Sequence, residues 1–393
     1  MTSLFVEEGQ AIALEPVESE HLQRLLGGLV DVRDGRVTVS RVVGHVRLPT
    51  RRVLRIRSPK APASSVLAWA AYVDPRLQAL QFLSGRVPVG GDEGDIASLL
   101  ARLFVMHLED AILRHGLLQQ YRRSRTESET VRGRIDFAQL TRQGANLARV
   151  PCEVWERNQA TPLNRFFAAA LAACARDGVL RTACDPALSR VQARMSAIAP
   201  AVDLQLLAGG RALDRAERPF APVIALARIL LTGVGVVEGA EKLGSGFLIN
   251  LETLFERTVV RAFRDNGIDV TAKSPLSYAR VDGASMDAAT GFEIDAFCRG
   301  LPAGDVVVDA KYKRHISSNN LHQMIAYCAL TGATHAAFIV PAGMVVDRRT
   351  YVFEHIGASA KLRIDVHEFA TDATDIAGWR TNAALLAARL RAA

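Results

Sequence analysis

Two short segments near the C-terminal third alternate between apolar and polar positions or run apolar, and a tight connection joins them. FEIDAFCR at 292–299 is followed by DVVVDAKYK at 305–313, with a Pro and a Gly between them, which predicts a β-hairpin. Because successive side chains of a strand point to opposite faces, Asp309 and Lys311 share one face. A register that brings Asp295 beside Asp309 gathers two carboxylates and an ammonium into one small volume.

Helical periodicity flanks this hairpin on both sides. Upstream, Asn250 is suited to cap a helix whose apolar stripe runs from Leu251 to Ala262, and Asn266-Gly267 ends it. Downstream, capping residues at 317–319 precede an apolar pattern from Leu321 to Cys328. On that second helix Gln323 and Tyr327, four residues apart, share another face.

The rest of the chain divides by pattern into three regions. Residues 1 to about 62 predict short strands separated by turn signals, followed by a helix at 65–75, and about 65–240 is predominantly helical. After the hairpin, three more strands and a closing helix are expected. The pattern predicts an α+β multidomain protein with a β-rich N-terminal domain at 1–90, a mainly helical middle region at 91–240, and a C-terminal domain at 241–393 whose mixed sheet is flanked by helices.

Half-buried acids and a lysine are costly beside a run of valines unless they serve a purpose. A divalent cation supplies one, since Mg²⁺ prefers carboxylate oxygens and keeps water ligands for chemistry. A D-x-K triplet also arises by chance, and strand-end ion pairs are common. Glu256, on the upstream helix, has the alternative of a solvated face where it pairs with Arg257 or Arg261.

The order of these residues resembles the PD-(D/E)xK nuclease superfamily and, more narrowly, the McrC family, the nuclease subunits of modification-dependent restriction systems. The resemblance rests on Phe255-Glu256 in a helix, Asp295 in a strand, and Asp309-Ala310-Lys311-Tyr312 in the next strand, with Gln323 and Tyr327 behind. An I-R-S-P-K segment at 56–60 and a G-R-I segment at 133–135 add to it. One departure is Ile294, where the superfamily pattern has proline.

The resemblance implies a PD-(D/E)xK α/β nuclease core and an endodeoxyribonuclease that hydrolyses phosphodiesters. Asp295 and Asp309, with the carbonyl of Ala310, would hold Mg²⁺, for which Mn²⁺ can substitute. Glu256 would bind a metal-bound water or a metal ion, Lys311 would orient the attacking water, and Gln323 would position Lys311 or the phosphate. The implied partners are an AAA+ GTPase hexamer, which this subunit stimulates through its N-terminal region, and double-stranded, modified DNA of the 5-methylcytosine type.

Arginine clusters offer contact surfaces for DNA or for a partner protein. The first falls within fourteen residues without an acid, and the second surrounds Gly133. Solvated arginines on an edge strand, in the first case, and around a structural turn, in the second, explain the same patterns. The residues expected to make such contacts are Arg51, Arg52, Arg55, Arg57, Lys60, Arg132, Arg134, Lys313 and Tyr327.

Composition limits the protein class without choosing a function. Hydrophobic residues make up 49% of the 393 residues and charged residues 23%, as in soluble globular proteins, and a net charge of +7 permits a polyanionic partner. The five cysteines lack C-x-x-C spacing, and no secretory signal or membrane-length apolar run is present, so a cytoplasmic protein with reduced thiols is expected. No Walker A motif occurs, so no nucleotide is expected to bind this chain.

Two other functions stay open on these residues. One is a non-cleaving activator or scaffold of an AAA+ ring, in which the nuclease fold only binds DNA. The other is a stand-alone repair or type II restriction nuclease. A neighbouring P-loop GTPase gene would favour the McrC interpretation, and a neighbouring methyltransferase gene the stand-alone nuclease.

Overall fold

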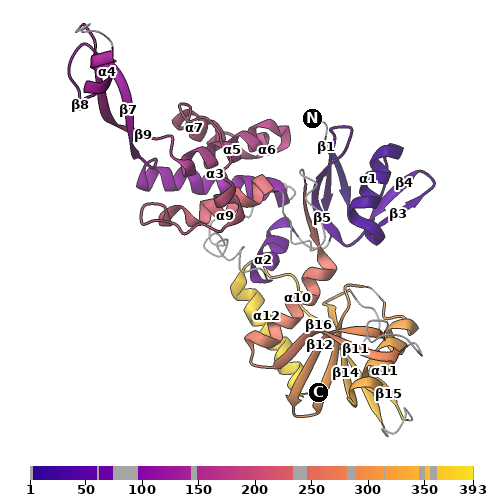
Figure 1. The fold of residues 1–393 in the computed structure, drawn as a ribbon. Coiled ribbons are helices and arrows are strands. Elements are labelled where there is room, and N and C mark those ends of the chain that lie inside the picture. Colours follow the sequence, from indigo (N-terminus) through magenta and orange to yellow (C-terminus); the bar gives the residue numbers. More distant parts are fainter. Residues whose placement is uncertain are drawn as a thin grey trace. The chain divides into compact units, whose positions relative to one another are not determined.

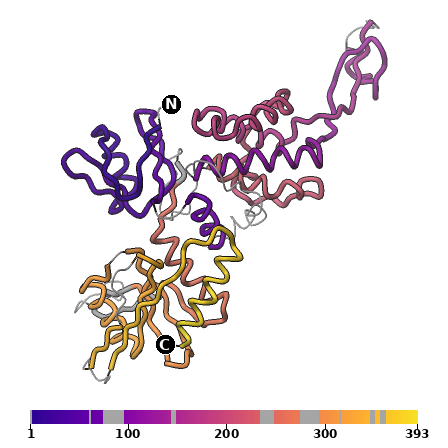
Figure 2. The backbone as a smooth tube through the Cα atoms, turned by 180° about the vertical axis from the view of Figure 1, so that it is seen from behind, coloured from indigo at the N-terminus to yellow at the C-terminus, as the bar shows by residue number. Residues whose placement is uncertain are grey.

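The computed structural model describes residues 3–59, 62–73, 96–142, 148–232, 246–280, 289–313, 315–344, 350–354 and 361–392. The chain forms two compact units (Figures 1 and 2), and the sequence is not divided between them in simple order. The first unit joins Met1–Leu99 to Gly233–Ala393, and the second is Leu100–Thr232. Both contain helices and sheets, so the predicted mixed α+β class is confirmed.

The N-terminal part of the first unit contains two small sheets that pack with helix α1. One sheet has the strand order β1-β6-β5-β10 and the other the order β2-β4-β3. Helix α1 (Pro16–Leu26), which was not among the predicted elements, packs its buried Leu22 and Leu26 into the shared core. The strands are β1 (Ser3–Glu7), β2 (Ala11–Ala13), β3 (Val30–Arg33), β4 (Arg36–Val39), β5 (Val42–Arg47), β6 (Val53–Arg57) and β10 (Gly246–Asn250).

Strand β6 corrects one prediction from the sequence. It lies between β1 and β5 rather than at a sheet edge, so the edge-strand interpretation of its arginines is wrong. Arg55 is completely buried, with its Nε donating to Ser3 Oγ over 3.4 Å, and therefore does not belong to an exposed basic surface. A strand that alternates between apolar and polar residues is expected to have one exposed face. The sequence pattern of β6 therefore did not indicate that both of its faces are buried.

Strand β10 ties this sheet to the C-terminal part of the same unit. It pairs antiparallel with β5, and its last residue, Asn250, directly precedes helix α10 (Leu251–Asp265). Helix α2 (Ala63–Val73) packs against α10 and the closing helix α12 (Ile376–Ala392). Its Trp69 ring stacks on that of Trp379 with a centroid distance of 5.3 Å.

A six-stranded mixed sheet forms the centre of the C-terminal part. Its order is β11-β12-β13-β14-β16-β15, and the pairs β13–β14 and β14–β16 are parallel while the others are antiparallel. Helix α11 (Ser318–Thr331) covers one face, and α10 and α12 pack together on the other (Figure 1). The strands are β11 (Asp269–Arg280), β12 (Ala289–Leu301), β13 (Gly304–Ala310), β14 (His335–Pro341), β15 (Tyr351–Phe353) and β16 (Leu362–Phe369).

The predicted hairpin, the later strands and the closing helix are therefore present. Strand β11 was not among the predicted elements. Pro275 lies within it, and a proline argues against a central strand. β11 is the edge strand of this sheet, where proline is tolerated.

The second unit combines a helical body with a β-arm. Helices α5 and α9 pack together within it, and Phe166, Phe167 and Phe220 lie in its core. Residues 186–208 contain two short helices, α7 and α8. The helices are α3 (Ile96–His115), α5 (Pro162–Arg176), α6 (Gly178–Cys184), α7 (Ala187–Arg194), α8 (Leu204–Ala208) and α9 (Ala221–Thr232).

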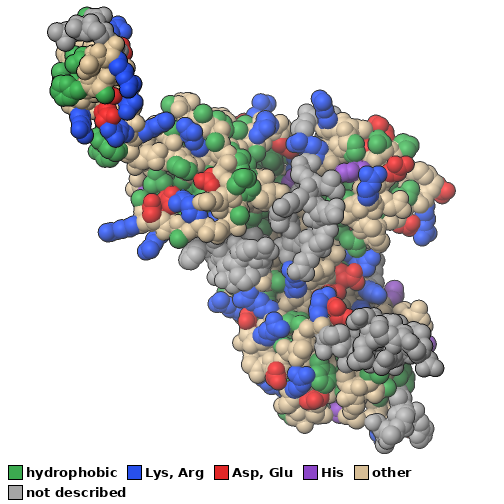
Figure 3. Space-filling view, in the orientation of Figure 1, with side chains coloured by type: hydrophobic (Ala, Val, Ile, Leu, Met, Phe, Trp, Pro, Cys, Tyr) green, Lys and Arg blue, Asp and Glu red, His purple; other side chains and the backbone are tan. Residues whose placement is uncertain are grey.

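The β-arm, residues 120–158, projects from these helices (Figure 2) and interrupts the helical region that the sequence predicts. It consists of a three-stranded sheet in the order β7-β9-β8 and the short helix α4 (Phe137–Arg142). Arginines follow its surface (Figure 3), and the rings of Tyr121 and Trp155 are exposed by 65% and 67%. Its strands are β7 (Gln120–Ser128), β8 (Arg134–Ile135) and β9 (Val150–Asn158).

None of the described helices is both long and apolar enough to cross a lipid bilayer.

Candidate functional site

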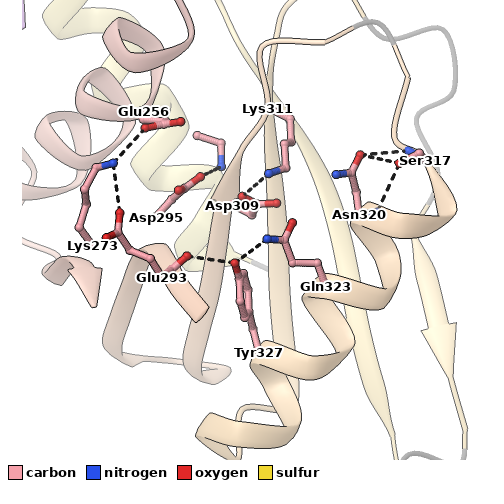
Figure 4. Close-up of polar contacts among 11 residues, drawn as sticks. Glu256, Lys273, Glu293, Asp295, Asp309, Lys311, Ser317, Asn320, Gln323 and Tyr327 are labelled. Carbon is pink, nitrogen blue, oxygen red and sulfur yellow. Dashed lines mark hydrogen bonds and ion pairs between the residues drawn. The ribbon is translucent and has the colours of Figure 1, made fainter. Parts of the chain in front are cut away.

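The β12–β13 hairpin places the two predicted aspartates next to each other. Ala296 pairs with Val308, so the next step of this antiparallel register sets Asp295 opposite Asp309. The Asp295 carboxylate accepts a hydrogen bond from the backbone N–H of Ala310, with an Oδ2–N distance of 3.0 Å. The strands therefore pair in the register that brings Asp295 beside Asp309, and the two side chains lie close together in Figure 4.

Lys311 joins this pair from the end of the same strand. Its Nζ lies 2.8 Å from Asp309 Oδ1, as expected for two residues on one face of a strand. The Lys311 backbone N–H donates to the carbonyl of Ile339 on the neighbouring parallel strand over 2.8 Å, which fixes where its side chain starts. Tyr312, on the opposite face, is buried and lies against Trp69 and Phe255, so its role is in packing.

Asp309 is a buried carboxylate with one unsatisfied oxygen. Its side chain is 3% exposed, and no donor in the described residues reaches Oδ2. Burial, together with the neighbouring Asp295 carboxylate, raises the pKa of Asp309 well above its usual range, although Lys311 opposes the shift. A cation placed between the two aspartates would stabilise their ionised forms.

Glu256 approaches from helix α10. The Asn250 side chain caps this helix by accepting from the backbone N–H groups of Glu252 and Thr253, as predicted, and Phe255 is buried beside Glu256. The Glu256 carboxylate is 20% exposed and contacts Lys273, so it does not lie on a solvated face paired with Arg257 or Arg261. Burial, and then the charge of Asp295, raise the Glu256 pKa to about 7.

Lys273 and Glu293 are additional charged residues of the site. Lys273 Nζ lies 3.5 Å from Glu256 Oε2 and 3.2 Å from Glu293 Oε1 (Figure 4). Burial acts to lower the pKa of Lys273, but the carboxylates of Glu256 and Glu293 raise it overall. Recognising Lys273 from the sequence would have required the pairing of β11 with β12.

Helix α11 contributes Gln323 and Tyr327 from its sheet-facing side. Ser317 caps the helix and forms a capping box with Asn320, which fixes its start. Gln323 Nε2 donates to the Tyr327 hydroxyl over 2.6 Å, and that hydroxyl donates to the Glu293 carbonyl over 3.0 Å. The ring of Tyr327 is buried in the core under α11, so its expected contact with DNA or a partner is wrong.

Ile294 stands where the superfamily pattern has proline. Its side chain is completely buried among residues of α11 and the sheet, including Met324 and Phe338. The position is a packing position in this fold, and the departure leaves the neighbouring Asp295 in place.

The expected contact residues at the N-terminus have different surroundings. Arg52 is held by Glu18, a completely buried acid, with Nε donating to Oε1 over 2.9 Å, so Arg52 has a structural role. The guanidinium of Arg57 lies 4.7 Å from the centre of the Phe5 ring. Arg51 is exposed, and Lys60 lies outside the described residues.

The remaining contact candidates occupy two places. Arg132 and Arg134 are exposed on the β-arm, and Lys313 is half-buried just after β13. Their predicted contacts with DNA or a partner stay predictions.

In the described part of the chain, no group of three or more His, Cys, Asp or Glu side chains is arranged to hold a metal ion. All five cysteines are free and buried, so they form no disulfide.

Comparison with known proteins gives a family match. The family model for the McrBC 5-methylcytosine restriction system component matches residues 37–341. No curated protein matches the chain.

Two solved structures are similar, both from Thermococcus gammatolerans. One is a half-complex from a tetradecameric assembly of McrB AAA+ hexamers with bound McrC, with 17% identity over 99% of this chain and 100% of that chain, and a TM-score of 0.66. The other is the McrBC complex, with 19% identity over 67% of this chain and 88% of that chain, and a TM-score of 0.47. The first of these shows a shared fold. Because the family model matches more than half of the sequence, the chain belongs to the McrBC 5-methylcytosine restriction system component family, as the resemblance implied.

Proposed function

We propose that this chain is the Mg²⁺-dependent DNA endonuclease subunit of a modification-dependent restriction system, with a PD-(D/E)xK core. The observation that carries the proposal is the cluster of Asp295, Asp309 and Lys311 at the end of two paired strands, with Glu256 beside it. Family membership supports the restriction system and its 5-methylcytosine class of target.

The residues present fit a divalent cation. Asp309 has a buried oxygen that no described donor reaches, and burial, together with the facing Asp295 carboxylate, raises its pKa. Asp295, Asp309 and the Ala310 carbonyl would hold Mg²⁺, with Mn²⁺ as a substitute. When bound, the ion would polarise the scissile phosphate and lower the pKa of a water ligand.

The protein side chains supply positioning and charge. Lys311, held by Asp309, would orient the attacking water and offset charge that develops on the phosphate. Glu256 would accept a proton from that water, since its pKa of about 7 suits a general base near neutral pH. Gln323, fixed by its bond to Tyr327, would align Lys311 or the phosphate from α11.

The proposed partner is an AAA+ GTPase hexamer of the McrB type, which this subunit also stimulates. Support comes from the similar T. gammatolerans structure, in which McrC is bound to McrB AAA+ hexamers, and from family membership. The partner would recognise modified double-stranded DNA and hydrolyse nucleotide, since this chain has no Walker A motif.

Plasmid cleavage tests the proposal. Methylated and unmethylated plasmids are incubated with Mg²⁺, GTP or ATP, and an McrB-type GTPase from the same source, with wild type or with Asp309→Asn or Lys311→Met. Both variants should lose at least 100-fold in cleavage rate while still binding the partner, because each removes one of the groups that make the site. Asp305→Asn, at the exposed start of the same strand, is the matched control and should cut normally.

Each outcome of this experiment has a defined meaning. Cutting that requires Asp309, Mg²⁺, the partner and methylation supports the proposed function. Full cleavage by either variant overturns the site assignment, and cleavage without any partner favours a stand-alone nuclease. Stimulated nucleotide hydrolysis without cutting under any condition would make the chain a ring activator.

A further inference from the structure

Lys273 lies in the same row of residues as the two aspartates, across three neighbouring strands. Ala272 pairs with Ala296 and Ser274 with Ile294, so Lys273 stands opposite Asp295, which in turn stands opposite Asp309. Residues directly opposite each other in antiparallel strands project to the same face. The β11 strand therefore sends a lysine towards the acids from the side away from Lys311.

The backbone at Lys273 is unusual for a residue in a strand. Its φ is +50°, in the left-handed region, which costs roughly 1 kcal/mol or more for a residue with a Cβ. The neighbouring pairs on both sides of this position are regular, so the left-handed conformation is confined to the residue whose ammonium contacts the acids. The surrounding structure holds the residue in this conformation.

The ammonium of Lys273 bridges two carboxylates from different elements. It contacts Glu256 of helix α10 at 3.5 Å and Glu293 of strand β12 at 3.2 Å (Figure 4). In a two-ion site the two metals lie about 3.5–4 Å apart and share acids, so a second ion here would need the carboxylates that the ammonium already contacts.

The charges of the named groups balance with one divalent ion. A bound cation favours the ionised form of a nearby carboxyl group, and the ionised acids Glu256, Glu293, Asp295 and Asp309 then carry four negative charges, while Lys273 and Lys311 carry two positive charges. The remaining charge of −2 matches one Mg²⁺. Glu252, the nearest further acid on α10, is already paired with Arg41 at 2.7 Å.

We propose that the Lys273 ammonium takes the place of a second metal ion, so that the site binds one divalent cation, between Asp295 and Asp309. This inference rests on the proposed function. It assigns Lys273 as a positioning residue that holds Glu256 beside the metal site. It also agrees with the absence, in the described residues, of any three acids arranged around one point, because Glu256 is directed to Lys273.

The test counts bound Mn²⁺ in the full chain by EPR titration of free Mn²⁺, which does not depend on cleavage. Wild type should bind one Mn²⁺. Lys273→Met, which keeps an unbranched side chain at the left-handed position but removes the charge, should bind two. Lys273→Arg restores the charge and should return the number to one, and adding Glu256→Gln to Lys273→Met should remove the second ion.

The outcomes separate this inference from the proposed function. Two ions in wild type, or one ion in Lys273→Met with an unchanged circular dichroism spectrum, would overturn the role of Lys273 and leave the metal site itself standing. No bound Mn²⁺ in wild type would overturn both. Asp309→Asn should abolish binding in every background, which ties the counted ion to the aspartate pair.

Discussion

The buried carboxyl group of Glu256 lowers the stability of the folded protein at neutral and higher pH. Its pKa is raised from 4.5 to about 7, so the folded state retains a proton that the unfolded state releases over that interval. The folded protein therefore loses stability as pH rises from about 4.5 to 7, and the loss is complete above pH 7. A pKa that rises from 4.5 to about 7 on folding corresponds to roughly 3 kcal/mol.

We expect Glu256→Gln to be more stable than wild type at pH 8 without metal, by up to about 3 kcal/mol, and equal to it at pH 4.5. The amide keeps the size of the side chain and removes the buried charge. The measurement is urea unfolding of both proteins across this pH range in EDTA. Identical pH profiles would show that Glu256 titrates normally and is better solvated than the structure indicates.

Asp305→Asn serves as the control for this measurement. Asp305 is exposed on β13 and accepts from the Gly300 N–H over 3.1 Å, a bond that an asparagine oxygen can also accept. Its pH profile should follow that of wild type.

At the scale of elements, the β-arm depends on one glycine. Gly133 has a φ of +74°, and a Cβ at this position would lie 2.4 Å from the backbone oxygen of Glu153 on β9. Any side chain here must push β8 away from β9. The backbone bond from Asp136 N–H to the Pro151 carbonyl, 2.8 Å long, lies just beyond and would be strained as well.

We expect Gly133→Ala to accelerate amide hydrogen exchange in β8 and β9 at least tenfold while the helices of the second unit keep their protection. The reason is the steric conflict with β9 together with the left-handed backbone. Gly178→Ala is the matched control, because Gly178 begins helix α6 with an ordinary φ and open space around its Cβ position. Equal protection in both variants would mean that the arm adapts without cost.

Local sequence pattern predicts the elements that carry the site better than it predicts how strands assemble. Asn250 and Ser317 are caps with a local hydrogen-bonding reason, and the alternation around Asp309 follows from strand geometry, so these features were readable. The burial of Arg55 depends on β1, a strand about fifty residues away, which covers β6 on its other edge. Lys273 was missed for the same reason, since its role exists only once β11 pairs with β12.

At the scale of the molecule, helix α2 packs the N-terminal part of the first unit against the C-terminal part. Trp69 of α2 is 1% exposed and contacts Phe255, Tyr312 and Trp379, all from the C-terminal part. Burying a ring of this size contributes roughly 4–6 kcal/mol by area. The predicted boundary at residue 241 separates these contacts, and it also separates β10 from β5.

We expect a fragment of residues 241–393 to lack a cooperative thermal transition. Residues 1–99 joined by a flexible linker to 233–393 should unfold in one transition, because that chain keeps Trp69 and β5. Differential scanning calorimetry of both proteins makes the comparison. A fragment that unfolds cooperatively at the same temperature as the linked chain would show that the C-terminal part is independent.

Asn250 connects the N-terminal sheet directly to the helix of the candidate site, with no loop between them. Its backbone pairs with Val42 at the end of β10, and its side chain caps the helix that carries Glu256 six residues later. At 1.5 Å per residue, about 9 Å of stiff backbone separates the two. A force that tilts the sheet must therefore rotate the first turns of α10 with it. Glu256 would then be displaced together with the sheet.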